Sequence, residues 1–119
     1  MILPNPQVAT QFRELGDGWF DGEGTALDKS GLAWLEQLFA EEFARDLPIP
    51  TFFPTPEGNV RIEWFAGRND VSLEVDLHDR TGYFHAMNLD SGVAEEANVN
   101  LQSQAEWAKL VATIRKLVS

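Results

Sequence analysis

The sequence contains no cysteine in its 119 residues. This absence excludes disulfide bonds, zinc sites built on thiolates and cysteine nucleophiles, and it suits a reducing compartment. No hydrophobic run approaches the roughly 18 residues that a membrane-spanning helix needs. The first six residues do not join a basic segment to an apolar stretch, as a secretory signal would. We therefore expect a soluble cytoplasmic protein without a membrane segment.

Basic residues are scarce. The chain has 9 lysines and arginines against 19 aspartates and glutamates, a formal net charge of −10 and a pI of about 4.4. Such a chain repels phosphate backbones and anionic lipids, so we expect no nucleic-acid binding and no membrane binding. Its electrostatic partners are cations or basic protein surfaces. An acidic surface also serves solubility alone, so the charge permits a basic partner without requiring one.

Catalytic signatures are equally sparse. The chain has two histidines and lacks both a Gly-x-Ser-x-Gly elbow and a P-loop lysine beside its glycines. Glu63, Glu74 and Asp76, with His78 at their margin, form a carboxylate cluster of the kind that binds metals or exchanges protons. A solvated polar sheet face accounts for these residues more simply. We predict no catalytic residue, no metal site and no cofactor.

The length fits a single domain over residues 1–119, with enough surface to bury for one hydrophobic core. Helical spacing of apolar residues predicts one helix over about 28–45, which Asp28 or Ser30 can cap and which Pro48 ends. A second helix follows Ser103, since Ser103 and Glu106 form a capping box. A short helix is expected over 6–15.

The region between the helices predicts a β-meander. Gly67 and Arg68 form a two-residue turn with glycine first, which is typical of a type II′ hairpin. The resulting register pairs Trp64 with Val71, Ile62 with Leu73 and Val60 with Val75 on the apolar face. On the opposite face it sets Arg61 against Glu74 and Glu63 against Ser72.

The second turn, at 79–82, has the chemistry of a type I turn followed by a glycine bulge at Gly82. The register from this turn sets His85 beside Leu77, Met87 beside Val75 and Leu89 beside Leu73, so that His85 faces the core. A third turn at 89–92 leads to a returning strand over 93–101. The fold class is therefore α+β, an antiparallel β-meander of about four strands with helices packed on one face. An unprotected sheet edge makes a homodimer conceivable.

The segment 16–24 combines four glycines, three carboxylates and two aromatic residues, which favours an irregular ordered loop with positive φ angles. Trp19 in this loop has two interpretations. It either anchors a protein partner, as tryptophans at interfaces do, or folds inward and fixes the loop to the domain. Asp21, Glu23, Glu57 and Glu63 join Trp19 as candidate binding residues if they converge into one acidic, aromatic-lined patch.

Two segments carry a family resemblance. Residues 19–24, which read W-F-D-G-E-G, and residues 54–64, which run from P-T-P-E-G-N to E-W, resemble a family of small uncharacterised bacterial proteins. The family pattern has a second glycine where this chain has Asn59, a residue that tolerates positive φ. The resemblance spans about residues 19–92 and implies no catalytic residue, because the family has no established activity.

Two classes of function follow. The first is a non-catalytic module, of the antitoxin, immunity or inhibitor kind, that meets a basic protein with its acidic surface. The second is a small metal-dependent enzyme or ligand-binding domain that uses the carboxylates of Asp21, Glu23 and Glu63. Small size, negative charge and the poor catalytic inventory favour the first.

Overall fold

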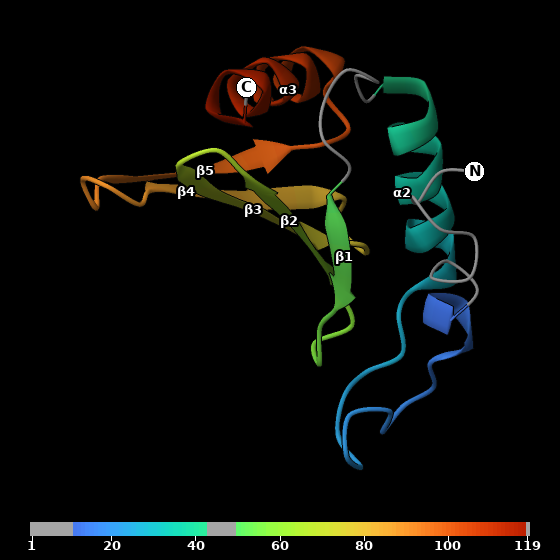
Figure 1. The fold of residues 1–119 in the computed structure, drawn as a ribbon. Coiled ribbons are helices and arrows are strands. Elements are labelled where there is room, and N and C mark those ends of the chain that lie inside the picture. Colours follow the sequence, from blue (N-terminus) through green and yellow to red (C-terminus); the bar gives the residue numbers. More distant parts are fainter. Residues whose placement is uncertain (1–10, 43–49, 119) are drawn as a thin grey trace.

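The computed structural model describes residues 11–42 and 50–118 (Figure 1). A helical turn over 11–14 precedes two helices and five strands: α2 (Lys29–Glu42), β1 (Thr51–Pro54), β2 (Val60–Ala66), β3 (Asn69–Asp76), β4 (Thr81–Asn88), β5 (Ala94–Asn100) and α3 (Gln104–Val118). No helix in the described ranges is long and apolar enough to cross a membrane.

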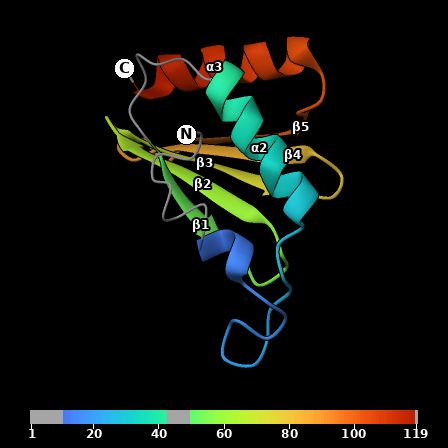
Figure 2. The same ribbon diagram turned by 90° about the vertical axis from the view of Figure 1, so that its right-hand side faces the viewer.

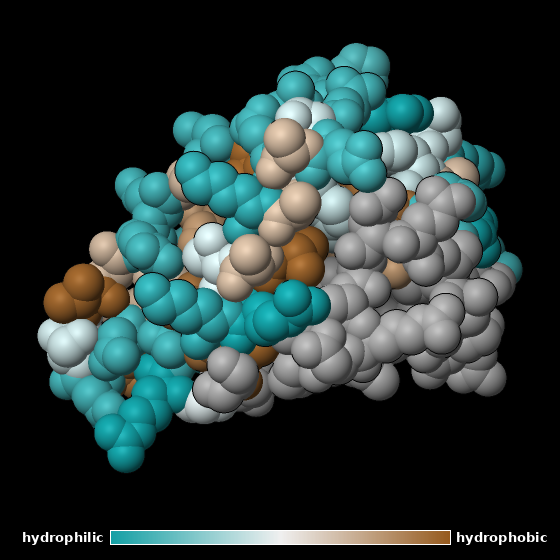
Figure 3. All heavy atoms as spheres, turned by 90° about the horizontal axis from the view of Figure 1, so that it is seen from above, coloured by the Kyte–Doolittle hydropathy of each residue, from teal (hydrophilic) through white to brown (hydrophobic). Residues whose placement is uncertain are grey.

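The strands form one antiparallel sheet in the order of the chain, β1-β2-β3-β4-β5. The sheet curls at β1, and both helices lie on its concave side, α3 above the sheet and α2 beside β1 (Figures 1 and 2). Buried residues of the two helices and the strands share one hydrophobic core. The outward surface of α3 is largely hydrophilic (Figure 3). The predicted α+β meander with helices on one face is confirmed.

The first hairpin has the predicted register. Trp64 pairs with Val71, Ile62 with Leu73 and Val60 with Val75, and all six side chains are fully buried. Gly67 has a φ of 69° and Arg68 has no positive φ, which matches a type II′ turn. Turn chemistry and apolar alternation specify the same register here, and each fixes it independently of the helices.

The predicted register of β3 and β4 is wrong. His85 lies opposite Ser72, Met87 opposite Asp70, and Phe84 opposite Leu73. The core face of β4 therefore consists of Gly82, Phe84 and Ala86, while His85 lies on the opposite face. Leu89 does not pair with β3 but lies in the next turn, 60% exposed.

The error comes from the length of the turn. Residues 77–80 form a four-residue loop in which Arg80, not Gly82, takes the left-handed conformation, at a φ of 59°. The carboxylate of Asp76 accepts hydrogen bonds from the backbone N–H groups of His78 and Asp79, and Leu77 turns into the core. Gly82 belongs to the strand, where an added Cβ would lie 2.8 Å from Leu73 Cδ1.

The sheet has five strands where about four were predicted, because β1 adds to the free side of β2. Phe52 pairs with Ile62 and is buried, and Phe53 pairs with Arg61 on the other face. The strand is only four residues long and ends in Pro54, so it shows little of the alternation that reveals strands in a sequence. The predicted strand over 93–101 is present as β5.

Both predicted helix caps are present. The carboxylate of Asp28 accepts a hydrogen bond from Gly31 N at 3.0 Å, and Ser103 Oγ accepts one from Glu106 N at 3.3 Å. The Glu106 carboxylate does not return to the N–H of Ser103 but accepts from Asn100 N at 3.1 Å, so it ties the end of β5 to α3. Phe43, Pro48 and the start of the expected 6–15 helix lie outside the described residues.

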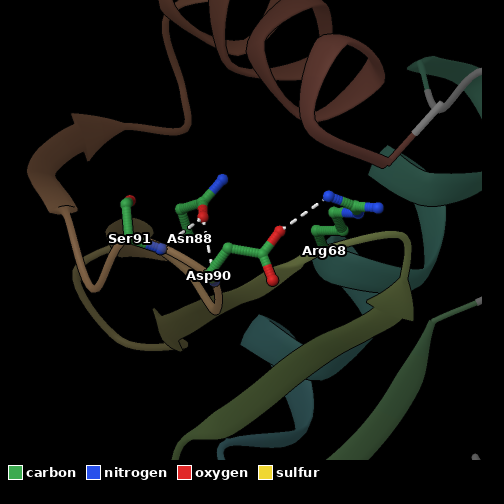
Figure 4. A network of polar contacts seen from close by, with 4 residues as sticks. All are labelled: Arg68, Asn88, Asp90 and Ser91. Atoms are coloured by element: carbon green, nitrogen blue, oxygen red, sulfur yellow. Dashed lines mark hydrogen bonds and ion pairs between the residues drawn. The ribbon is translucent and has the colours of Figure 1, made fainter.

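The third turn is confirmed and is held by polar contacts (Figure 4). Gly92 has a φ of 75° and donates to Asn88 O at 2.8 Å, while the side-chain oxygen of Asn88 accepts from the N–H groups of Asp90 and Ser91. An ion pair of 2.9 Å joins Asp90 to Arg68 of the β2–β3 turn. The two turns therefore lie side by side at one end of the sheet.

Candidate functional site: an acidic sheet face and a glycine-rich loop

The face of the sheet opposite the helices is polar. Because side chains alternate along a strand, this face carries the residues that pair between the core positions. We call the following residues of β2 to β5 the open face: Arg61, Glu63, Asp70, Ser72, Glu74, Asp76, Tyr83, His85 and Glu96. A hollow of about 270 Å³ at its centre is lined by Arg61, Ser72, Glu74, Tyr83 and His85.

The open face is acidic. Arg61 is its one fixed cation, and Arg61 Nε forms an ion pair of 2.7 Å with Glu63 Oε1 while lying opposite Glu74. This leaves an excess of carboxylates over cations, from β3 to β5. Because the Arg61 side chain is 52% exposed, this one ion pair contributes less than about 1 kcal/mol to stability. The summed potential of the excess carboxylates on the open face attracts positively charged groups of a partner.

One row of side chains crosses four strands at the same level. Glu63 pairs with Ser72, Ser72 with His85, and His85 with Glu96. The row places a serine, a histidine and a carboxylate next to one another, but in the part of the chain that the structure describes no hydrogen bond joins Ser72 to His85. The carboxylate of Glu96 instead accepts a hydrogen bond from the hydroxyl of Tyr83. The arrangement lacks the connected donors and acceptors of a nucleophilic triad.

The hydrogen bond to Glu96 raises the pKa of Tyr83 above its ordinary value of 10.0, with smaller contributions from desolvation and from the negative charge of Glu96. Tyr83 is the only tyrosine of the chain, so tyrosinate absorbance reports on this group alone. We expect Tyr83 to titrate above pH 10 in the native protein and Glu96→Gln to lower its pKa toward that value.

The sign of the linkage follows from the raised pKa. The neutral hydroxyl is the donor, so the stability from this bond is complete below the pKa of the unfolded chain and is lost as pH rises through the folded pKa. An identical tyrosine titration in the native protein and in Glu96→Gln would contradict the contact between β4 and β5 on the open face.

The loop over 16–24 is ordered by its own contacts. Gly18, Asp21, Gly22 and Gly24 have positive φ angles, as predicted for this glycine-rich segment. Trp19 Nε1 donates to Thr25 O at 2.8 Å, and the ring packs edge-on against Phe20 at 5.7 Å. Trp19 is half-buried over its own loop, so it fixes the loop rather than projecting from it. Asp21 and Glu23 are exposed.

This loop is joined to the turn between β1 and β2. Thr25 N donates to Pro56 O at 2.8 Å, and an added Cβ on Gly58 would lie 3.2 Å from Ala26 O. The two segments that carry the family resemblance are therefore neighbours in space, although about 30 residues separate them in sequence. Glu57 lies exposed in the turn.

Glu63 does not belong to this junction. It lies three residues beyond the start of β2, which corresponds to about 10 Å along the strand, and its carboxylate is paired with Arg61 on the open face. The five candidate residues therefore do not form one patch: Trp19, Asp21 and Glu23 lie in the loop, Glu57 lies in the turn that Thr25 and Ala26 contact, and Glu63 lies on the open face.

Tyr83, His85 and Glu96 were not among the predicted site residues. The sequence does contain a signal for Tyr83 and His85, because they alternate with the apolar residues Phe84 and Ala86 along β4. This alternation predicts that Tyr83 and His85 lie on the outer face. Within the described ranges, no group of three or more histidine, aspartate or glutamate side chains is arranged to hold a metal ion. Comparison of the chain with protein-family models, curated proteins and solved structures found no match, so the resemblance to the bacterial family stays a prediction.

Proposed function

We propose that this chain is a non-catalytic protein-binding module that binds a basic protein on its open face. The observation that carries the proposal is the division of the sheet into two faces. Both described helices pack on one side, while the other side carries five carboxylates, of Glu63, Asp70, Glu74, Asp76 and Glu96, against the single guanidinium of Arg61.

The open face also supplies the aromatic contacts that protein interfaces use. Tyr83 and Phe53 are each 41% exposed on this side of the sheet. Tyrosine is enriched among the residues that dominate binding energy because it combines a large apolar ring with a hydrogen-bonding hydroxyl. A rigid antiparallel sheet holds these groups in place, so little conformational entropy is lost when a partner binds. Carboxylates around them accelerate encounter with a basic surface.

A pull-down with matched charge variants tests the proposal. The face variant carries Asp70→Asn, Glu74→Gln and Glu96→Gln, and the loop variant carries Asp21→Asn, Glu23→Gln and Glu57→Gln. Each removes three negative charges, so the two differ only in where the charge is lost. We expect the wild-type protein to retain a stoichiometric basic protein that salt releases. The face variant should bind this protein about tenfold more weakly, and the loop variant within about twofold of wild type.

Equal melting temperatures of the two variants establish that both are folded. Loss of binding in the loop variant alone would move the binding surface to the junction of loop and turn. Retention of full affinity in the face variant would overturn the proposal.

A further inference from the structure

The strand β5 leaves one side of its backbone open. It lies at the edge of the sheet and pairs with β4 alone. Asn88 N donates to Val93 O at 2.9 Å, and Leu101 N donates to Arg80 O at 3.2 Å. In an antiparallel ladder these directions alternate. The odd-numbered residues of β5 therefore face β4, and the N–H and C=O groups of Ala94, Glu96 and Asn98 point away from the sheet.

The next residue of this outward series is already occupied. Asn100 N donates to Glu106 Oε1 at 3.1 Å, which confirms the outward direction of the series and closes the edge at the end near α3. In the described part of the chain, the outward groups of Ala94, Glu96 and Asn98 have no partner. The free edge therefore spans about five residues, enough for one short added strand.

A groove runs beside this edge. It has a volume of about 310 Å³ and lies between β5 and α3, where Phe84, Ala97, Val99 and Leu110 form its apolar part. The side chains of a sixth strand would alternate between this groove and the open face. The two environments differ: the groove combines its apolar residues with Glu95 and Glu106, and the open face offers the carboxylate of Glu96.

The charge of the edge selects its occupant. Glu95, Glu96 and Glu106 surround the edge, and Lys109 is the one cation in the groove. A second copy of this chain would bring the same carboxylates and a further net charge of −10 to the contact. Charged edge strands of this kind prevent self-association. A strand with basic side chains would instead neutralise them.

We propose that a short extended segment of a basic protein, with alternating basic and apolar residues, adds to β5 as a sixth strand. Its backbone bonds to Ala94, Glu96 and Asn98, its basic side chains lie beside Glu96, and its apolar side chains enter the groove. This mode of recognition uses main-chain hydrogen bonds for affinity and alternate side chains for selectivity. The inference rests on the proposed function and names the part of the partner that binds.

The probe is a heptapeptide of alternating lysine and valine, acetylated and amidated at its ends, titrated into the full chain. We expect binding that salt weakens and slowed amide hydrogen exchange at Ala94, Glu96 and Asn98. The odd-numbered residues of β5 are already protected by β4, so their exchange should change little.

Two variants of Asn98 distinguish the role of its backbone N–H group from the role of its side chain. Asn98→Pro removes an outward N–H without removing a bond to β4, which is the position where an edge strand tolerates proline. It should weaken peptide binding about tenfold, because it removes one donor and places a ring at the edge. Asn98→Ala keeps the donor and should bind within about twofold of wild type.

Absence of peptide binding at millimolar concentration, equal affinity for Asn98→Pro and wild type, or unchanged exchange at Glu96 and Asn98 would each overturn the inference. Binding of the captured basic protein to the two kinds of variant distinguishes failure of the added-strand inference from failure of the proposed function. If that protein binds Asn98→Pro as well as wild type yet loses affinity for the face variant, the added strand is wrong and the binding face stands. Full affinity for the face variant overturns both.

Discussion

Replacing Gly31 with alanine is expected to lower the free energy of unfolding by about 3 kcal/mol or more. An added Cβ at this position would lie 2.7 Å from Leu77 Cβ and 2.8 Å from Leu77 C, and closer still to the Leu77 carbonyl oxygen. Leu77 is 1% exposed and belongs to the β3–β4 loop, so neither its backbone nor its side chain has room to move. The steric cost must also exceed the helix propensity that alanine gains over glycine, about 1 kcal/mol.

Gly16→Ala is the matched control for this substitution. Nothing lies within 4 Å of a Cβ added at Gly16, and its φ is not positive. We therefore expect a change within about 0.5 kcal/mol, with a slight gain in stability from the smaller entropy of the unfolded chain. Chemical denaturation of both variants measures the difference. A Gly31→Ala protein as stable as Gly16→Ala would mean that α2 does not begin against the β3–β4 loop.

Replacing Trp107 with alanine is expected to cost about 3–5 kcal/mol, a large part of the net stability of a domain of this size. Trp107 is 1% exposed in α3, and its ring packs edge-on against Phe39 of α2 at a centroid distance of 5.7 Å. Phe39 packs in the same way on Phe52 of β1, at 5.3 Å. The alanine variant removes the ring that joins the two helices and leaves a cavity between them.

The Trp107→Phe variant distinguishes the contribution of aromatic packing to stability from that of the indole N–H group. The buried Nε1 of Trp107 has no hydrogen-bond partner among the described residues, so phenylalanine removes a donor that gains nothing in the folded state. We expect phenylalanine to lose less than about half of what alanine loses, as measured by denaturant unfolding at constant slope. Equal losses for the two variants would mean that a phenylalanine ring at position 107 does not restore the packing against Phe39, which would contradict this account.

The two hairpins show how far the sequence predicts this fold. At Gly67 the turn type and the alternation of the flanking strands agree, so one register satisfies both. At 77–82 the sequence is compatible with a glycine bulge at Gly82 and with a four-residue loop in which Arg80 takes positive φ. Packing decides between them, because the longer loop buries Leu77 and sets Gly82 beneath Leu73 and Leu101. Such tertiary contacts leave no local mark on the sequence.

The candidate site was harder to predict than the fold. The wrong register placed His85 on the core face. It therefore did not predict that Tyr83, His85 and Glu96 are neighbours on the open face. The composition of residues 19–24 predicted an ordered loop that contains candidate binding residues. In the structure Trp19 hydrogen-bonds to Thr25, which directly follows this loop, and Thr25 also hydrogen-bonds to the β1–β2 turn. The positive φ angles of Gly22 and Gly24 and the hydrogen bond of Trp19 thus explain the glycines and the tryptophan of this segment, while Asp21 and Glu23 lie exposed. The open face is assembled from four strands, so it can be predicted only when the register of each strand pair is correct.

Amide chemical-shift mapping of the isotope-labelled chain, titrated with the basic protein that the pull-down retains, tests the central claim most directly. The account predicts that the largest shifts fall on Ser72, Glu74, Tyr83, His85 and Glu96, with residues 19–24 unchanged. Shifts confined to residues 19–24 and Glu57, with the open face unchanged, would contradict it.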